Sequence, residues 1–155
     1  MTHREQAEEL RLALAMGLIE KAHVIRWADA LIVEEASPPK WLLDVSLAAT
    51  EPKDAVATRL EEAADLIDVT VPTRAALERF AREFRAGRIA PLDAAQMLVS
   101  WATSNRVRDG WDQGEALEAK FLAEDVAEGL CGSSDDVTRA IEQFLARHEG
   151  TRRAG

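Results

Sequence analysis

Apolar residues recur every three to four positions along almost the whole chain, and Gly or Pro interrupts this pattern at intervals. Such a spacing places apolar side chains on one face of a helix. It predicts helices at about residues 2–16, 20–35, 38–49, 52–67, 74–86, 91–104, 112–130 and 135–148. No run of alternating apolar residues is long enough to form a strand. We therefore expect an all-α fold, a single compact domain of about eight helices.

Local chemistry predicts several of the helix ends. Gly17 and Gly87 stand where helical patterns stop, and glycine readily adopts the left-handed conformation that ends many helices. Ser37, followed by two prolines, predicts the start of the third helix, because serine is a favoured N-cap and proline fits a first turn. Asp112 with Glu115 three residues later has the spacing of a capping box. It predicts where the seventh helix starts.

The apolar pattern repeats at an offset of 70 residues. The first stretch places apolar residues or Gly at Leu10, Leu14, Gly17 and Ile19, and the second places them at Phe80, Phe84, Gly87 and Ile89. A repeat of this kind is typical of two related halves. The other interpretation is that two unrelated amphipathic helices fall into register. The predicted boundaries are 2–69 and 72–148 for the halves, 68–73 for the loop between them, 1–149 for the domain and 150–155 for a disordered tail.

Composition fits one domain without covalent or metal support. The chain has 155 residues, of which 47% are hydrophobic, and its only cysteine, Cys131, can form no internal disulfide. The first ten residues are charged where a secretory signal needs an apolar core, and no apolar run reaches the roughly 18 residues of a membrane span. We therefore expect a cytoplasmic protein. The abundance of Ala and Arg indicates a GC-rich, bacterial genome.

The net charge of −9 is unevenly distributed. Residues 1–68 carry −7, residues 69–110 carry +3 and residues 111–155 carry −5. An acidic surface repels phosphate groups, and the arginines of the middle segment occupy the polar side of one predicted helix, as on an ordinary solvated face. We therefore expect neither nucleic acid nor a membrane as partner. A positively charged protein, or self-association of the basic segment with the acidic ones, fits the charge better.

The third predicted helix has few polar positions. Its apolar residues cover most of the circumference: Trp41, Leu42, Leu43, Val45, Leu47, Ala48 and Ala49. Such a helix is expected to be surrounded by protein, and Asp44 would then be a buried carboxylate that needs a partner. Asp44 is either an acid in a cleft with a raised pKa or the partner of an arginine or a helix start elsewhere in the fold. We favour the partner, and we include Asp44 among the candidate partner-binding residues.

The loop before Trp111 contains Arg106 and Arg108. An aromatic residue flanked by arginines is common in the energetically dominant part of a protein interface. Trp111 also precedes the predicted Asp112 cap, where an apolar side chain packs on the first turn as a hydrophobic staple. The two roles are compatible if one edge of the ring stays exposed. Arg106, Arg108 and Trp111 are therefore candidate partner-binding residues.

One carboxylate pattern suggests metal chemistry. Glu61, Glu62 and Asp65 look like half of the magnesium motif of all-α nucleotide pyrophosphohydrolases, in which carboxylates one helical turn apart share a hydrated cation. Those enzymes have a second acidic pair shortly before it. Here the nearest such pair, Glu5 and Glu8, lies more than fifty residues upstream at the frayed start of the first helix. This departure weakens the resemblance.

Other catalytic signatures are missing from the sequence. His3, His23 and His148 do not have the spacing of zinc ligands, and we expect His23 to pack beside Trp27 at the edge of an apolar face. Cys131 has no assured histidine partner. We therefore predict no catalytic residue, no metal and no cofactor.

The stretches GLIEKAHVIRWADALI, PPKWLLDVSLA and GRIAPLDAAQMLVSWA resemble small bacterial helical proteins that combine a Gly-x-Ile turn with a helix ending in a Trp-Ala pair. The resemblance covers roughly residues 16–49 and, more loosely, 87–102. It implies an all-α domain without an assigned activity and transfers no catalytic residue.

These observations favour a non-enzymatic interaction protein, of the immunity or regulatory type, that holds a protein partner through an acidic face. The alternative is a magnesium-dependent hydrolase that uses Glu61, Glu62 and Asp65.

Overall fold

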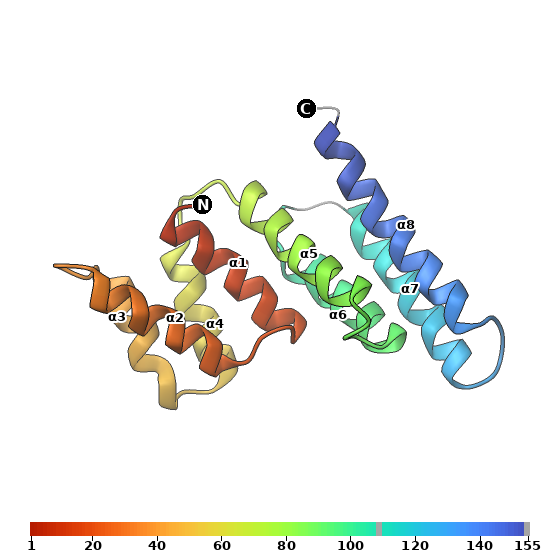
Figure 1. Ribbon diagram of the computed structural model, residues 1–155, viewed down its shortest axis with the longest axis horizontal. Coiled ribbons are helices and arrows are strands. Elements are labelled where there is room, and N and C mark those ends of the chain that lie inside the picture. Colours follow the sequence, from red (N-terminus) through yellow and green to blue (C-terminus); the bar gives the residue numbers. More distant parts are fainter. Residues whose placement is uncertain (108–109, 154–155) are drawn as a thin grey trace. The chain divides into compact units, whose positions relative to one another are not determined.

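In the computed structural model the chain is all-α (Figure 1), and the structure describes residues 1–107 and 110–153, without the side chains of residues 110, 111 and 150–153. The elements are α1 (His3–Met16), α2 (Lys21–Glu34), α3 (Lys40–Leu47), the 3-10 helix η1 (Ala48–Thr50), α4 (Lys53–Ala63), α5 (Thr70–Arg85), α6 (Pro91–Ser104), α7 (Gly110–Ala127) and α8 (Ser134–Arg153). No strand occurs in the described residues, and the predicted all-α class is confirmed.

The glycine signals for helix ends are confirmed. Gly17 follows α1 with a φ of 81°, and its amide donates to carbonyl oxygens of the last turn. Gly87 follows α5 with a φ of 75°, and its amide donates to the Phe84 oxygen over 2.9 Å. Both residues adopt the left-handed conformation that a side chain disfavours. At the other end of α1, Thr2 and Glu5 form a capping box that the sequence interpretation did not identify.

Several predicted helix starts are wrong. Pro39, which has no side-chain donor or acceptor, is the N-cap of α3, and Ser37 lies too far before the helix to cap it. Asp112 is not a cap, because α7 already begins at Gly110 and Asp112 lies in its first turn. The predicted loop at residues 68–73 is also shorter, since α5 begins at Thr70. Pro72 is tolerated there because the first amides of a helix have no helical acceptor.

Three helices end at other places than predicted, and the first is α7, which ends at Ala127 and not near residue 130. α4 ends at Ala63 and not near residue 67, and Leu66 beyond it has a φ of 66°. A left-handed leucine gives no signal in the sequence, because this conformation is normally taken by Gly or Asn. α8 continues to Arg153 and not to His148, so the predicted disordered tail overlaps it at residues 150–153.

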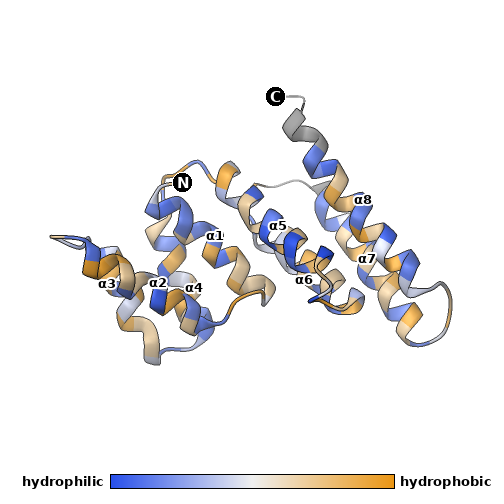
Figure 2. Ribbon diagram, viewed as in Figure 1, coloured by the Kyte–Doolittle hydropathy of each residue, from blue (hydrophilic) through white to orange (hydrophobic). Residues whose placement is uncertain are grey.

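The prediction that protein surrounds the third helix is wrong. Leu42 and Val45 of α3 are fully buried, but Leu47 is 77% exposed and Leu43 is 39% exposed. Figure 2 shows apolar segments of α3 beside polar ones. One buried side is sufficient to fix α3, and its remaining apolar residues lie at the surface.

Contacts between Cα atoms divide the chain into two compact units, Met1–Ala76 and Leu77–Gly155. In the first unit α1 packs on α4, α2 packs on α3, and α3 packs on α4. Their shared core is apolar: Ala7, Leu10, Leu14, Val24, Ala28, Leu42, Val45, Ala48, Val56, Leu60 and Ala63.

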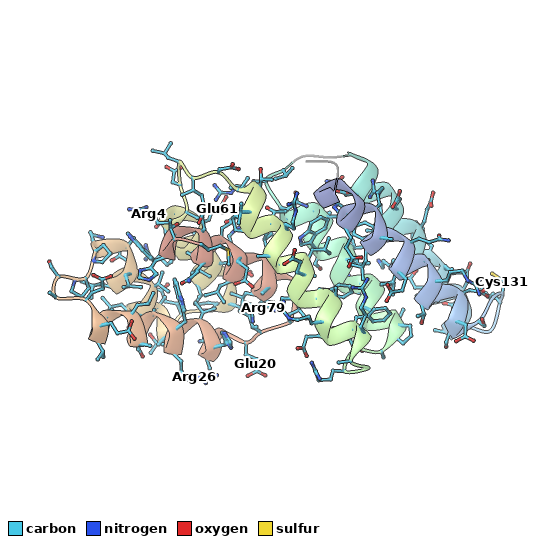
Figure 3. The ribbon with its side chains drawn as sticks, turned by 45° about the horizontal axis from the view of Figure 1, so that its top comes forward. Arg4, Glu20, Arg26, Glu61, Arg79 and Cys131 are labelled. Atoms are coloured by element: carbon cyan, nitrogen blue, oxygen red, sulfur yellow. The ribbon has the colours of Figure 1, made fainter. Side chains whose placement is uncertain are left out.

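Arg4 joins the first and last helices of this unit. Its guanidinium donates to the carbonyl oxygen of Ala63 over 2.7 Å, and its central carbon lies 5.5 Å from the ring centroid of Trp41. Trp41 in turn lies beside Trp27, with 6.4 Å between ring centroids. Figure 3 shows Arg4 near the end of α4, where Glu61 is labelled. The arginine therefore satisfies one of the free carbonyl groups at the C-terminus of α4.

In the second unit α6, α7 and α8 pack against one another (Figure 1). Trp101 of α6 makes an edge-on contact with Phe144 of α8, with 5.8 Å between ring centroids. Arg85 of α5 binds two carboxylates of α8, Glu142 at 2.9 Å and Glu149 at 2.7 Å. These contacts join α5 and α6 to α8.

Some of the helix bounds follow the offset of 70 found in the sequence, whereas α1 and α5 begin 67 residues apart and α4 and α8 begin 81 residues apart. α2 spans residues 21–34 and α6 spans 91–104, so both ends differ by 70, and α3 and α7 begin at residues 40 and 110. The matched positions Leu10 and Phe80 are both buried, as are Leu14 and Phe84. A common origin of the halves stays a prediction, because equal helix lengths do not by themselves show descent.

Candidate functional site

A polar cluster of the second unit lies where the first turn of α7 meets the C-terminal part of α8. It consists of Asp112 and Glu115 of α7 and Arg147 and His148 of α8, and we call it the Asp112 cluster. Arg147 donates to Asp112 Oδ1 over 2.6 Å and lies 3.1 Å from Glu115 Oε2. His148 Nε2 lies 3.0 Å from the same Asp112 oxygen.

Asp112 is the buried member of this cluster. Its side chain is 6% exposed, whereas those of Arg147 and His148 are 36% and 25% exposed. A buried carboxylate needs charged or hydrogen-bonding partners to offset its loss of hydration, and α8 supplies two of them. The amides of the first turn of α7 add a favourable dipole for a negative charge at this position. In the first unit the residue 70 positions earlier is Leu42, which is fully buried.

An aromatic wall fixes the histidine. The His148 ring makes an edge-on contact with Trp101, at 5.2 Å between centroids, and a tilted contact with Phe144, at 5.0 Å. The Arg147 guanidinium lies 5.5 Å from the centroid of the Phe144 ring. One nitrogen of His148 therefore lies at the Asp112 carboxylate, and its ring packs against Trp101 of α6 and Phe144 of α8.

The contacts described within the cluster are those of a structural anchor. Catalysis by an Asp–His pair needs a hydroxyl or thiol within hydrogen-bond reach of the histidine. The described contacts of His148 are the Asp112 carboxylate and the rings of Trp101 and Phe144. The free thiol of Cys131 lies in the turn between α7 and α8, where it points to solvent beside Asp125 (Figure 3). The cluster is thus an anchor of α8 on α7.

The thiol is also poorly activated. Partial desolvation, together with the negative charge of Asp125, raises the pKa of the Cys131 thiol above its ordinary value. Since the thiolate is the reactive form, this environment disfavours a nucleophile at neutral pH.

The outward side of α7 is a second candidate region. Gly114, Leu117 and Phe121 follow one another at helical spacing and are all exposed, with Phe121 at 56%. Two acidic residues border this line, Glu118 and Asp125. We call these five residues the α7 outer face. It combines an apolar line with negative charge; the sequence analysis expected the negative charge of a partner surface but not the apolar line.

Asp44 lies at the surface of the first unit. Its side chain is 30% exposed, and Lys40 of the same helix donates to its Oδ2 over 2.6 Å. The expectation of a buried carboxylate is wrong, and the partner is neither an arginine nor a helix start. The neighbouring Ser46 donates a hydrogen bond to Asp29 of α2.

The predicted arginine-bearing loop is described only in part. Arg106 is half-buried just after α6, next to Asn105, whose side-chain amide donates to the Trp101 oxygen over 2.9 Å. Arg108 and the side chain of Trp111 lie outside the described residues. Their role in partner binding stays a prediction.

The three carboxylates of the alternative prediction, a magnesium-dependent hydrolase, are not on one helix. α4 ends at Ala63, so Glu61 and Glu62 lie in its last turn and Asp65 lies beyond it. Glu62 is 3.7 Å from Arg59, and all three acidic residues are exposed. In the described part of the chain, no three His, Cys, Asp or Glu side chains are arranged to hold a metal ion.

The second acidic pair that we considered is also unsuited to metal binding. Glu8 is fully buried and not at a frayed end, because α1 is buried along most of its length. Arg11 donates to both of its carboxylate oxygens, over 2.7 and 2.8 Å. Burial opposes the charge of the guanidinium, but Glu8 outweighs it and raises the pKa of Arg11. Glu8 and Arg11 therefore form an internal ion pair of α1.

The arginines of α5 and of the turn that follows it are in part neutralised within the chain. Arg85 binds Glu142 and Glu149, and Arg88 binds Glu83 over 2.6 Å. A phosphate backbone would have to displace these carboxylates. Among the described helices none is long and apolar enough to cross a membrane.

No family model matches the chain, and no curated protein or solved structure matches it significantly. The resemblance to small bacterial helical proteins therefore stays a prediction.

Sequence reasoning missed both members of α8 in the Asp112 cluster. Arg147 and His148 lie 35 and 36 residues after Asp112, at what the sequence pattern took for the end of the last helix. The offset of 70 contained one usable signal, since it matches the acidic Asp112 with the apolar Leu42. A polar residue at a position that is apolar in the other half indicates a specialised contact.

Proposed function

We propose that this protein is a non-enzymatic interaction module that binds a positively charged protein partner through an acidic surface of its second unit. The observation that carries the proposal is the α7 outer face, where exposed apolar side chains lie beside carboxylates. Exposed apolar side chains that are bordered by polar groups are typical of protein interfaces.

Charge supports the same interpretation. The net charge of the chain is −9, and residues 111–155 contribute −5 of it. Such a surface attracts a basic protein over a distance of roughly one Debye length, about 8 Å at physiological ionic strength, and so accelerates association. It repels nucleic acids and anionic membranes for the same reason. The Asp112 cluster supports this role by fixing α7 on α8.

Affinity capture with two charge-reversed variants tests the proposal. The wild-type protein is immobilised and exposed to an extract of its source cells, and retained proteins are identified at low and high salt. We expect a basic protein to be retained at low salt and released by salt. Glu118→Lys with Asp125→Lys should abolish the retention. The matched control, Glu34→Lys with Asp65→Lys, changes two exposed carboxylates of the first unit by the same amount and should retain the partner. Absence of any partner that distinguishes the two variants would refute the proposal.

A further inference from the structure

We propose that the α7 outer face binds an amphipathic basic helix of the partner, whose apolar side packs along Gly114, Leu117 and Phe121. This inference depends on the proposed function and specifies its partner. Its basis is the order of side chains on one helix, their exposure and their charge.

The apolar line of α7 is continuous along one direction. At about 100° per residue, positions 114, 117 and 121 fall within about 60° of one another, so their side chains form one ridge. Leu117 is 38% exposed and Phe121 is 56% exposed, although α7 already buries Ala116, Ala119 and Ala123 on its opposite side. The ridge is therefore not needed for packing within the second unit. A helix laid along it would contact Leu117 and Phe121 at successive turns.

Gly114 provides a second, independent observation. Glycine inside a helix destabilises it by about 0.5–1 kcal/mol relative to alanine. Packing against the described side chains does not require this glycine, because a Cβ at position 114 would meet none of their atoms within 4 Å. Its φ is not in the left-handed range, unlike that of Gly17 or Gly87. A glycine on an exposed ridge lets another backbone approach closely. Such an approach would explain why this turn of α7 has no side chain.

The charge around the ridge selects the partner. Glu118 and Asp125 lie on one side of Phe121, and on the other side Glu124 is 3.5 Å from Lys120. Lysine or arginine residues that flank the apolar side of a partner helix would face the first two carboxylates. A second copy of the chain would instead bring Glu118 and Asp125 of both copies together, and like charges disfavour that arrangement. The surface therefore fits a basic helix better than self-association.

A pair of synthetic peptides tests the inference on the full-length protein. Both are amphipathic helices of 18 residues, about five turns, with the same leucines and alanines; one carries lysine and the other glutamate at every polar position. Fluorescence anisotropy of the labelled peptides measures their binding. We expect the lysine peptide to bind, with an affinity that falls as salt is raised, and the glutamate peptide not to bind.

Three variants locate the binding surface. Phe121→Ala should weaken binding of the lysine peptide at least about tenfold, as truncation of an interface aromatic commonly does. Gly114→Gln should weaken it also, because the added side chain blocks the close approach while the helix itself gains stability. The matched control is Leu47→Ala on α3, an exposed apolar residue of the first unit, and it should bind like the wild type.

Equal binding of the two peptides would overturn the inference, as would equal effects of Phe121→Ala and Leu47→Ala. The captured cellular partner separates this inference from the proposed function. If Phe121→Ala retains that partner as the wild type does, the helix-binding ridge is refuted while the proposed function stands. If the wild type captures no salt-sensitive partner, the proposed function itself fails.

Discussion

Replacement of Asp112 by asparagine should destabilise the second unit by about 1–2 kcal/mol. Asn has almost the same volume, so the change removes the negative charge from Arg147 and His148 without opening a cavity. A hydrogen bond to a charged group contributes about 1.5–3 kcal/mol. The expected loss lies at and somewhat below the lower end of this range, because Arg147 and His148 are 36% and 25% exposed and water screens part of the interaction. Arg147 also keeps its second carboxylate, Glu115, at 3.1 Å.

Urea unfolding measures this loss. With a slope of about 2 kcal/mol per molar urea, the middle of the usual range, the midpoint should fall by roughly 0.5–1 M while the slope stays unchanged. Single-tryptophan variants that keep Trp101 report on the second unit, since this ring lies 5.2 Å from His148. Variants that keep Trp27 or Trp41 report on the first unit, where the midpoint should not move if the two units unfold separately.

A double-mutant cycle assigns the effect to the ion pair. When Arg147 is replaced by methionine, Asp112→Asn should cost about 1 kcal/mol less than it does in the wild type. The control is Asp44→Asn, whose carboxylate is paired with Lys40 at the surface and should contribute less than about 0.5 kcal/mol. The reasoning is refuted if Asp112→Asn and Asp44→Asn shift the midpoint equally, or if the cycle gives no coupling.

Three further changes have defined outcomes. Leu66→Gly should raise the thermal midpoint and add up to about 1 kcal/mol, because glycine relieves the left-handed strain of a side chain that is 96% exposed; a lower midpoint would contradict this. Asp136→Asn should reduce stability at neutral pH but not in acid, since hydrogen bonds from Ser133 lower the pKa of the Asp136 carboxyl. The Asp136 carboxylate stabilises the fold fully above its ordinary pKa of about 3.9, and this stabilisation is lost as the pH falls through its lowered pKa. The unfolding curves of the variant and the wild type should therefore converge in acid but differ at neutral pH. Cys131 should react with a chromogenic disulfide only at a higher pH than a free cysteine does, because desolvation and the Asp125 charge raise the pKa of its thiol. Asp125→Asn should shift the pH profile of this reaction to lower pH. An unchanged profile would exclude a contribution of the Asp125 charge.

The sequence predicted best what local chemistry decides. Gly17, Gly87 and Pro91 mark helix ends at the residues where the structure has them, because the backbone conformation of Gly and Pro depends little on distant contacts. The end of α4 was missed for the opposite reason. It ends without a glycine, at a turn in which Leu66 takes the left-handed conformation, and no local signal distinguishes this leucine from a helical one.

Tertiary contacts account for the errors at the candidate sites. Asp112 has the local spacing of a helix cap, yet its position is fixed by two residues of α8 that no spacing rule connects to it. Asp44 was expected in the core because seven apolar residues surround it in the sequence. The structure buries one side of α3 only, and Lys40 on the same helix is sufficient to pair its charge. Periodicity indicates how many sides of a helix are apolar but not how many become covered.

The bond from Arg4 to the Ala63 carbonyl has a consequence for the order of folding in the first unit. It joins residues 59 positions apart, so it closes a loop that contains α2, α3 and most of α4. Closing a long loop has a large entropic cost, whereas α2 and α3 are neighbours along the chain and can pair early. We therefore expect the hairpin of α2 and α3 to form first and α1 to dock on α4 late. The bond of Arg4 then forms after the rate-limiting step of folding. Its loss would speed unfolding and leave the folding rate almost unchanged.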